Sequence, residues 1–136
     1  IGFIVPTEAK REYYAKHLNK NEFERTNKKP IISTYHAELA ENVNIDFSYG
    51  GIVVLIDKSV KGIEFDIVFV LIDGFKNPNN DIESLQKRLY VISSRAKEKL
   101  FFFQNPKYNN VVNDTLPKVG ELSEVTGEEL LKRRTI

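Results

Sequence analysis

Two short segments of this chain carry side chains suited to binding phosphates. The first, Lys58–Asp66, reads K-S-V-K-G-I-E-F-D, and the second, Arg88–Lys97, reads R-L-Y-V-I-S-S-R-A-K. An arginine guanidinium is always charged and forks onto two phosphate oxygens, whereas a lysine contacts a phosphate as a point charge. A glycine allows a tight turn and a close approach of the backbone to a ligand. A charged ligand such as a nucleotide or a nucleic acid therefore suits both segments.

Buried strands and one long helix must position these segments. Ile52–Ile56 and Ile67–Ile72 are continuous apolar runs, which are typical of strands buried on both faces of a parallel sheet. After a loop, Asn80 or Asp81 caps a predicted helix that reaches about Lys99. Its apolar residues recur three or four positions apart and form one stripe: Ile82, Leu85, Leu89, Ile92 and Ala96.

The remaining apolar runs complete an alternating pattern. Gly2–Val5 predicts a strand, and Thr7 caps a helix over Ala9–Leu18. Ile31–Tyr35 and Leu100–Phe103 predict two more strands, the latter of the buried type. Alternation of strands and helices predicts an α/β layered sheet, in which ligands bind beyond the carboxyl ends of the strands. A further helix is predicted near 127–134.

The two segments, taken in this order, resemble two sequence blocks of superfamily 1 helicases of the UvrD/Rep/PcrA type. The family patterns are T-x-H-x-x-K-G-L-E-F-D and L-Y-V-A-x-T-R-A-K. This chain has K-G-I-E-F-D and L-Y-V-I-S-S-R-A-K, and the resemblance covers Ile52–Phe103. It implies a RecA-like three-layer α/β/α domain with a mostly parallel central sheet, the second of the two motor domains of an ATP-dependent DNA helicase or translocase.

The resemblance also implies roles for single residues. Arg95 matches the arginine finger, which stabilises the charge of a γ-phosphate during ATP hydrolysis. Glu64 is expected to accept a hydrogen bond from the nucleotide sugar, with Gly62 and Lys61 in the same ATP-binding loop. Ser94 takes the place of the family's usual threonine, which supports the helix locally.

Contact with single-stranded DNA is implied for the start of the same loop. There the family's threonine and histidine fall on Ile56 and Lys58, and Ile56 cannot donate a hydrogen bond from its side chain. Lys58 can still contact a phosphate, and Ser59 keeps a hydroxyl at a matching place. We therefore expect Lys58 and Ser59 to be the DNA-binding residues.

The phosphate-binding loop of such a motor is missing from this chain. No G-x-x-x-x-G-K-[ST] pattern occurs in residues 1–136, which we interpret as one domain. The chain also lacks methionine, so we expect it to be part of a longer protein. ATP with Mg²⁺ would then be held mainly by an N-terminal RecA-like domain of the same protein. The isolated chain is expected to be inactive.

The amino-acid composition excludes several classes of protein for this chain. The chain has 136 residues, 41% hydrophobic and 29% charged, which excludes a mostly disordered chain. A net charge of +1 excludes a histone-like polycation. Cysteine is absent and there are 2 histidines, so no metal site is predicted. No apolar run is long enough to cross a membrane. The resemblance to helicases implies a cytoplasmic setting in DNA repair or recombination.

Three other functions fit the same residues. The domain could belong to a helicase–nuclease subunit, which a nuclease domain elsewhere in the protein would reveal. It could be a degenerate motor domain that binds protein or DNA without catalysis, as the residues at Ile56 and Lys58 allow. It could also be an unrelated α/β binding domain.

Several conspicuous side chains have an ordinary structural interpretation. Arg88 is predicted to be a solvated charge on the helix surface, and Tyr90 to pack the helix on the sheet. Asp73 is interpreted as a strand-end residue. Lys97 and Lys99 are predicted at a helix C-terminus, where the helix dipole favours cations.

Overall fold

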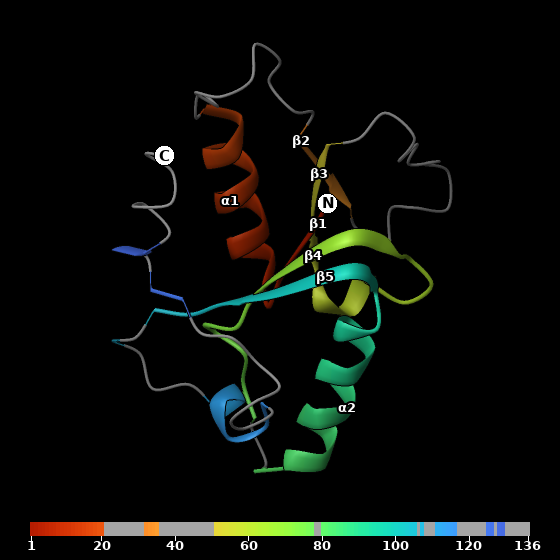
Figure 1. Cartoon of the computed structure of the whole chain (residues 1–136), viewed down its shortest axis with the longest axis vertical. Coiled ribbons are helices and arrows are strands. Elements are labelled where there is room, and N and C mark those ends of the chain that lie inside the picture. Colours follow the sequence, from red (N-terminus) through yellow and green to blue (C-terminus); the bar gives the residue numbers. More distant parts are fainter. Residues whose placement is uncertain are drawn as a thin grey trace.

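A five-stranded parallel sheet forms the centre of the molecule. The computed structural model describes residues 1–20, 32–35, 51–77, 80–105, 107, 111–116, 125, 126, 128 and 129. The strand order is β2-β3-β1-β4-β5, and every neighbouring pair is parallel (Figure 1). The strands are β1 (Gly2–Val5), β2 (Ile32–Tyr35), β3 (Ile52–Ile56), β4 (Phe65–Leu71) and β5 (Ala96–Phe103).

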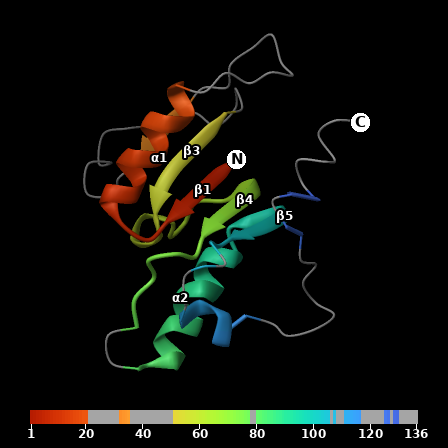
Figure 2. The same cartoon turned by 90° about the vertical axis from the view of Figure 1, so that its left-hand side faces the viewer.

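Two helices cover opposite faces of this sheet. Helix α1 (Glu8–Lys20) buries Ala15 against Val5, Val54 and Leu71 on one face. Helix α2 (Ile82–Ser93) buries its apolar residues Leu85, Leu89 and Ile92 on the other (Figure 2). Central strands are apolar on both sides because both of their faces are covered. The expected three-layer α/β fold with a parallel sheet is thereby confirmed, and it is consistent with a RecA-like domain.

Helix α2 is shorter than its apolar spacing predicts. It ends at Ser93, and the predicted extension to Lys99 is wrong. Ser94 and Arg95 form a turn, and Ala96 then pairs with Phe65 and Lys99 with Ile67 in the sheet. Pairing with β4 satisfies the backbone of this segment and overrides its helical spacing. Lys97 and Lys99 therefore lie on a strand and not at a helix C-terminus.

Strand β5 is only partly buried, which corrects the expectation for Leu100–Phe103. Leu100 and Phe102 pack on the face covered by α2, whereas Phe101 and Phe103 on the other face are 43% and 41% exposed. Both exposed rings stack on Phe69 of β4, with centroid distances of 5.0 Å and 5.4 Å. The strand lies at the end of the strand order, away from the core that α1 makes over β1 and β3.

The predicted helix starts are confirmed. The hydroxyl of Thr7 accepts a hydrogen bond from the Lys10 amide at 3.3 Å. The Asp81 carboxylate accepts the Ser84 amide at 3.1 Å and the Ser84 hydroxyl at 2.6 Å. Of the helix predicted near 127–134, Glu128 and Glu129 are helical and the other residues lie outside the described part. In the part of the chain that is described, no helix is long and apolar enough to span a membrane.

The Asp81 cap should make stability depend on pH. Hydrogen bonds from the Ser84 side chain and then its backbone lower the pKa of Asp81 below the ordinary value of 3.8. The folded state therefore favours the carboxylate, and this stabilisation is complete above the ordinary pKa and lost as the pH falls through the lowered value. We expect Asp81→Ala to lower the melting temperature at pH 7, with the difference shrinking below about pH 4.

Asp81→Asn is the matched control, since asparagine caps helices well without titrating. Melting curves followed by circular dichroism at several pH values check the prediction. A deficit for Asp81→Ala that stays constant down to low pH would contradict it.

Candidate functional site

The loop between β3 and β4 connects the two ends of the sheet. Both strands are parallel to β1, which lies between them, so the chain leaves the carboxyl end of β3 and enters the amino end of β4. Gly2 pairs with Val53 on one side and with Val68 on the other. This register separates Ile56 from Phe65 by roughly 20 Å along the strand direction. The first and last residues of the loop therefore lie at opposite ends of the sheet.

Glu64 and Arg95 are brought together at the amino ends of β4 and β5. The amide of Phe65 donates a hydrogen bond to the Arg95 carbonyl at 2.8 Å, and Phe65 pairs with Ala96. The Phe65 ring is buried and packs over Gly2, where an added Cβ would lie 2.4 Å from the ring. Glu64 directly precedes Phe65 in the chain and is exposed, so its backbone lies next to the Arg95 turn and its side chain is open to solvent.

The side chain of Arg95 folds back on the end of α2. Its Nε donates to the Val91 carbonyl at 3.1 Å, and Nη2 donates to the Ser94 hydroxyl at 3.1 Å. The Ser94 hydroxyl itself donates to the Val91 carbonyl at 2.9 Å. Such bonds satisfy a carbonyl that has no partner within the helix, and the positive charge suits the C-terminal end of the helix dipole. They are exposed and local, so the guanidinium can exchange them for an anion.

Lys61 and Gly62 lie in a tight turn near the end of the loop. The Ile63 amide donates to the Val60 carbonyl at 3.1 Å, and Gly62 has a φ of +82°. A positive φ at the third position of such a turn favours glycine. A Cβ added to Gly62 would meet no atom within 4 Å, so backbone conformation and not packing selects this glycine.

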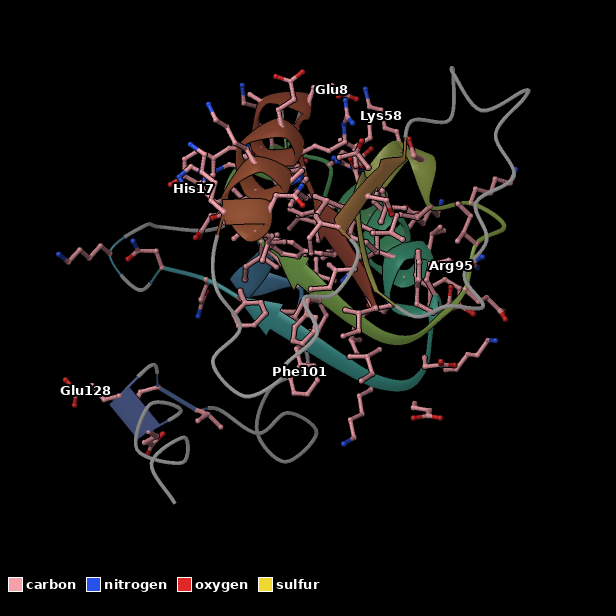
Figure 3. The ribbon with its side chains drawn as sticks, turned by 90° about the horizontal axis from the view of Figure 1, so that it is seen from above. Glu8, His17, Lys58, Arg95, Phe101 and Glu128 are labelled. Carbon is pink, nitrogen blue, oxygen red and sulfur yellow. The ribbon has the colours of Figure 1, made fainter. Side chains whose placement is uncertain are left out.

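Lys58 and Ser59 lie in the 3₁₀ turn Asp57–Ser59 that directly follows β3. Lys58 is exposed, whereas Ser59 is 4% exposed. Figure 3 shows Lys58 well apart from Arg95 when the molecule is viewed from above. The loop therefore does not bring all candidate residues into one site. Glu64 lies beside Arg95, and the two residues expected to bind DNA lie toward the opposite end of the sheet.

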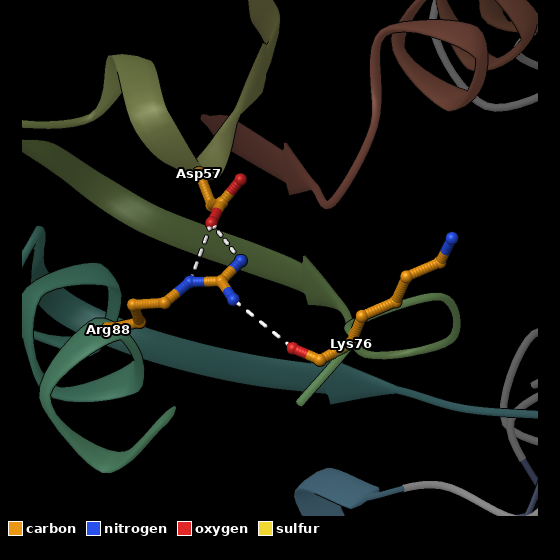
Figure 4. A network of polar contacts seen from close by, with 3 residues as sticks. All are labelled: Asp57, Lys76 and Arg88. Atoms are coloured by element: carbon orange, nitrogen blue, oxygen red, sulfur yellow. Dashed lines mark hydrogen bonds and ion pairs between the residues drawn. The ribbon is translucent and has the colours of Figure 1, made fainter. Parts of the chain in front are cut away.

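An ion pair between Asp57 and Arg88 is the site feature that the sequence analysis missed. Both Nε and Nη2 of Arg88 donate to Oδ2 of Asp57, at 3.1 Å and 2.5 Å (Figure 4). Arg88 also donates to the Lys76 carbonyl at 3.4 Å, and its guanidinium lies 5.2 Å from the centre of the Phe75 ring. Arg88 is therefore not the solvated charge that was predicted.

A weak signal for this pair is present in the sequence. Asp57 directly follows a buried strand, and Arg88 directly precedes Leu89 of the apolar stripe of α2. The Asp57 carboxylate can reach Arg88 only if α2 packs close to the carboxyl end of β3. That packing is a property of the tertiary structure, and no local pattern contains it.

Two other predictions have clear outcomes. Asp73 follows the end of β4 and accepts a hydrogen bond from the Asn105 amide at 2.8 Å, which confirms it as a strand-end residue. Tyr90 is 76% exposed, so the prediction that it packs α2 on the sheet is wrong. It lies on the outward face of the helix because the inward face is occupied by Leu85, Leu89 and Ile92.

Comparisons with known proteins give a partial structural likeness. No protein-family model matches the chain, and the search of curated proteins gives no match. The structure is similar to a crystal structure of the C-terminal domain of a possible DNA helicase from Lactobacillus plantarum WCFS1. The identity is 24%, the TM-score is 0.49, and the match covers 74% of this chain and 53% of that one. The chain thus spans about half of that domain.

Replacement of Gly62 isolates the requirement for the turn. We expect Gly62→Ala to lower the free energy of unfolding by about 1–2 kcal/mol, because alanine must adopt a positive φ there. No steric clash adds to that cost. Urea unfolding of the two proteins measures it.

Gly62→Asn is the control, since asparagine tolerates this conformation better than alanine. It should lie between the wild type and Gly62→Ala. Equal stability of all three proteins would contradict the strained-turn explanation.

Proposed function

We propose that this chain is the C-terminal motor domain of an ATP-dependent DNA helicase or translocase of superfamily 1. Arg95 would act as the arginine finger, with Glu64, Lys61 and Gly62 in the ATP-binding loop. The observation that carries the proposal is the contact between the two motif segments. The hydrogen bond from the Phe65 amide to the Arg95 carbonyl places the end of K-G-I-E-F beside the turn of S-S-R-A.

The chemistry of these residues suits a site that one domain completes for another. ATP with Mg²⁺ would bring triphosphate charge that a guanidinium stabilises during transfer of the γ-phosphoryl group. Arg95 is half-buried just beyond the end of a helix, and its guanidinium donates exposed hydrogen bonds to Val91 and Ser94 of that helix end, which a ligand from outside this domain can replace. Glu64 can accept a hydrogen bond from a sugar hydroxyl next to it. A Gly-rich phosphate loop would have to come from the N-terminal RecA-like domain.

An apolar surface beside Arg95 supports docking of such a domain. Tyr90 is 76% exposed and Val91 37% exposed, both within the last turns of α2. Aromatic side chains such as tyrosine are enriched at protein–protein interfaces relative to the rest of the surface. A partner covering Tyr90 and Val91 would bring its own ligand next to the Arg95 guanidinium, which bonds to Val91.

Contact with single-stranded DNA is proposed for the opposite end of the loop. Lys58 is exposed there and can contact a phosphate. Ser59 is 4% exposed, so a phosphate contact through its hydroxyl requires the turn to open. One continuous loop would then run from the DNA contact to the nucleotide contact, which is an arrangement suited to coupling ATP hydrolysis to movement.

A non-catalytic docking module is the second candidate. It is favoured by the burial of Ser59 and by the engagement of Arg95 with its own helix end. In that case the Arg95 guanidinium would serve as a helix cap, and its loss would affect stability but not ATP turnover.

Replacement of Arg95 tests its proposed role as the arginine finger. In the full-length protein that contains this chain, we expect Arg95→Ala to reduce DNA-stimulated ATP hydrolysis by about 10³-fold or more, because transition-state charge is left without its cation. Binding of a fluorescent ATP analogue should persist. Steady-state turnover with and without single-stranded DNA, together with analogue titration, measures both.

Two further variants sharpen the result. Arg95→Lys keeps the charge but not the fork and should recover little activity. Lys97→Ala removes a nearby exposed cation on β5 and should hydrolyse ATP at the wild-type rate. Undiminished turnover by Arg95→Ala would favour the docking module.

A further inference from the structure

Arg88 connects three segments that are far apart in the chain. It lies on α2 and bonds to Asp57 in the β3–β4 loop and to the Lys76 carbonyl in the loop between β4 and α2. Its guanidinium also lies over Phe75, which is buried in the core on the α2 side. A planar guanidinium that donates hydrogen bonds from its edge and packs its face on an aromatic ring has little freedom to move.

Asp57 is the buried member of the ion pair. The Asp57 side chain is 4% exposed and that of Arg88 is 39% exposed. The second carboxylate oxygen of Asp57, Oδ1, is buried and accepts no hydrogen bond from the described residues. A buried carboxylate is costly unless it is paired, so the pairing with Arg88 stabilises this conformation of the loop.

The pair sits between the two ends of the candidate site. Asp57 is the first residue of the turn that holds Lys58 and Ser59. Arg88 lies five residues, or roughly 8 Å, before Ser93, the last residue of α2, and Arg95 stands in the turn that follows. The ion pair therefore fixes the start of the loop to the helix that ends just before the Arg95 turn.

A second ion pair on α2 is exposed and provides a comparison for the Asp57–Arg88 pair. Lys87 and Glu83 are 2.7 Å apart, one turn from each other, and their side chains are 73% and 75% exposed. That pair joins α2 only to itself and contributes little in water. The Asp57–Arg88 pair has a buried carboxylate and a partly exposed guanidinium, and it joins two different elements.

We propose that Asp57 and Arg88 are positioning residues that transmit the state of the loop at Lys58 to helix α2 and so to Arg95. When DNA binds at Lys58, a shift of the 3₁₀ turn would pull on Arg88 through Asp57 and reorient the end of α2. This inference rests on the proposed motor function and adds a specific coupling contact to it. Neither residue touches the nucleotide or the DNA.

The coupling is tested in the full-length protein with two mild variants. Asp57→Asn removes the negative charge at constant size, and Arg88→Lys keeps a cation but loses the fork. We expect both to lower the ratio of ATP turnover with saturating single-stranded DNA to turnover without DNA by about fivefold. A purely structural role would scale both rates with the folded fraction and leave this ratio unchanged.

Glu83→Gln and Lys87→Gln are the controls, because they break an ion pair on the same helix that reaches no other element. Both should keep the wild-type ratio. Melting temperatures identify any variant that is partly unfolded at the assay temperature. If Asp57→Asn unfolds, Arg88→Lys carries the test.

Hydrogen exchange on the 136-residue chain gives a readout that needs no ATP hydrolysis. We expect both variants to exchange faster at the amides of residues 58–64 and to match the wild type in β1. Unchanged exchange in the loop would overturn the positioning role.

The outcomes separate the two proposals. A wild type whose turnover is unaffected by DNA contradicts the motor function and the coupling together. A wild type that DNA stimulates, beside variants stimulated to the same degree, contradicts the coupling alone.

Discussion

The parallel pairing of β4 with β5 is the constraint on which the candidate site depends. Phe65 pairs with Ala96, so the residue before each strand lies at the same end of the sheet. Those residues are Glu64 and Arg95, which are separated by a loop, a strand and a helix in the sequence. The ring of Phe65 over Gly2 and the bond from its amide to Arg95 hold this juncture in place.

A second consequence of parallel strands is that one loop reaches both ends of the sheet. The crossover from β3 to β4 begins at Lys58 and Ser59 and ends at Glu64, with β1 between the two strands. Ligands were expected at the carboxyl ends of the strands, yet Glu64 and Arg95 lie at the amino ends. The candidate residues therefore lie at both ends of the sheet, and the β3–β4 loop connects the two groups.

The partly buried Asp57–Arg88 pair holds the start of that loop against helix α2. Because the carboxylate is 4% exposed and bonds through one oxygen to Arg88, its position is tied to helix α2. Separating the two residues would leave the buried Asp57 carboxylate unpaired, and the cost of that state favours the paired arrangement. The ion pair joins the β3–β4 loop to helix α2, and the last turn of α2 accepts a hydrogen bond from Arg95.

What the sequence by itself determined was local: the apolar strands, the caps at Thr7 and Asp81, the parallel α/β class and the two motif segments. Continuous apolar runs and capping residues act over a few positions, so they can be read along the chain. Tertiary structure alone decided that α2 ends at Ser93, that Tyr90 faces outward and that Arg88 pairs with Asp57. Each of these depends on a partner far away in sequence, since strand pairing overrides helical spacing and a buried carboxylate selects whichever cation the packing brings within reach.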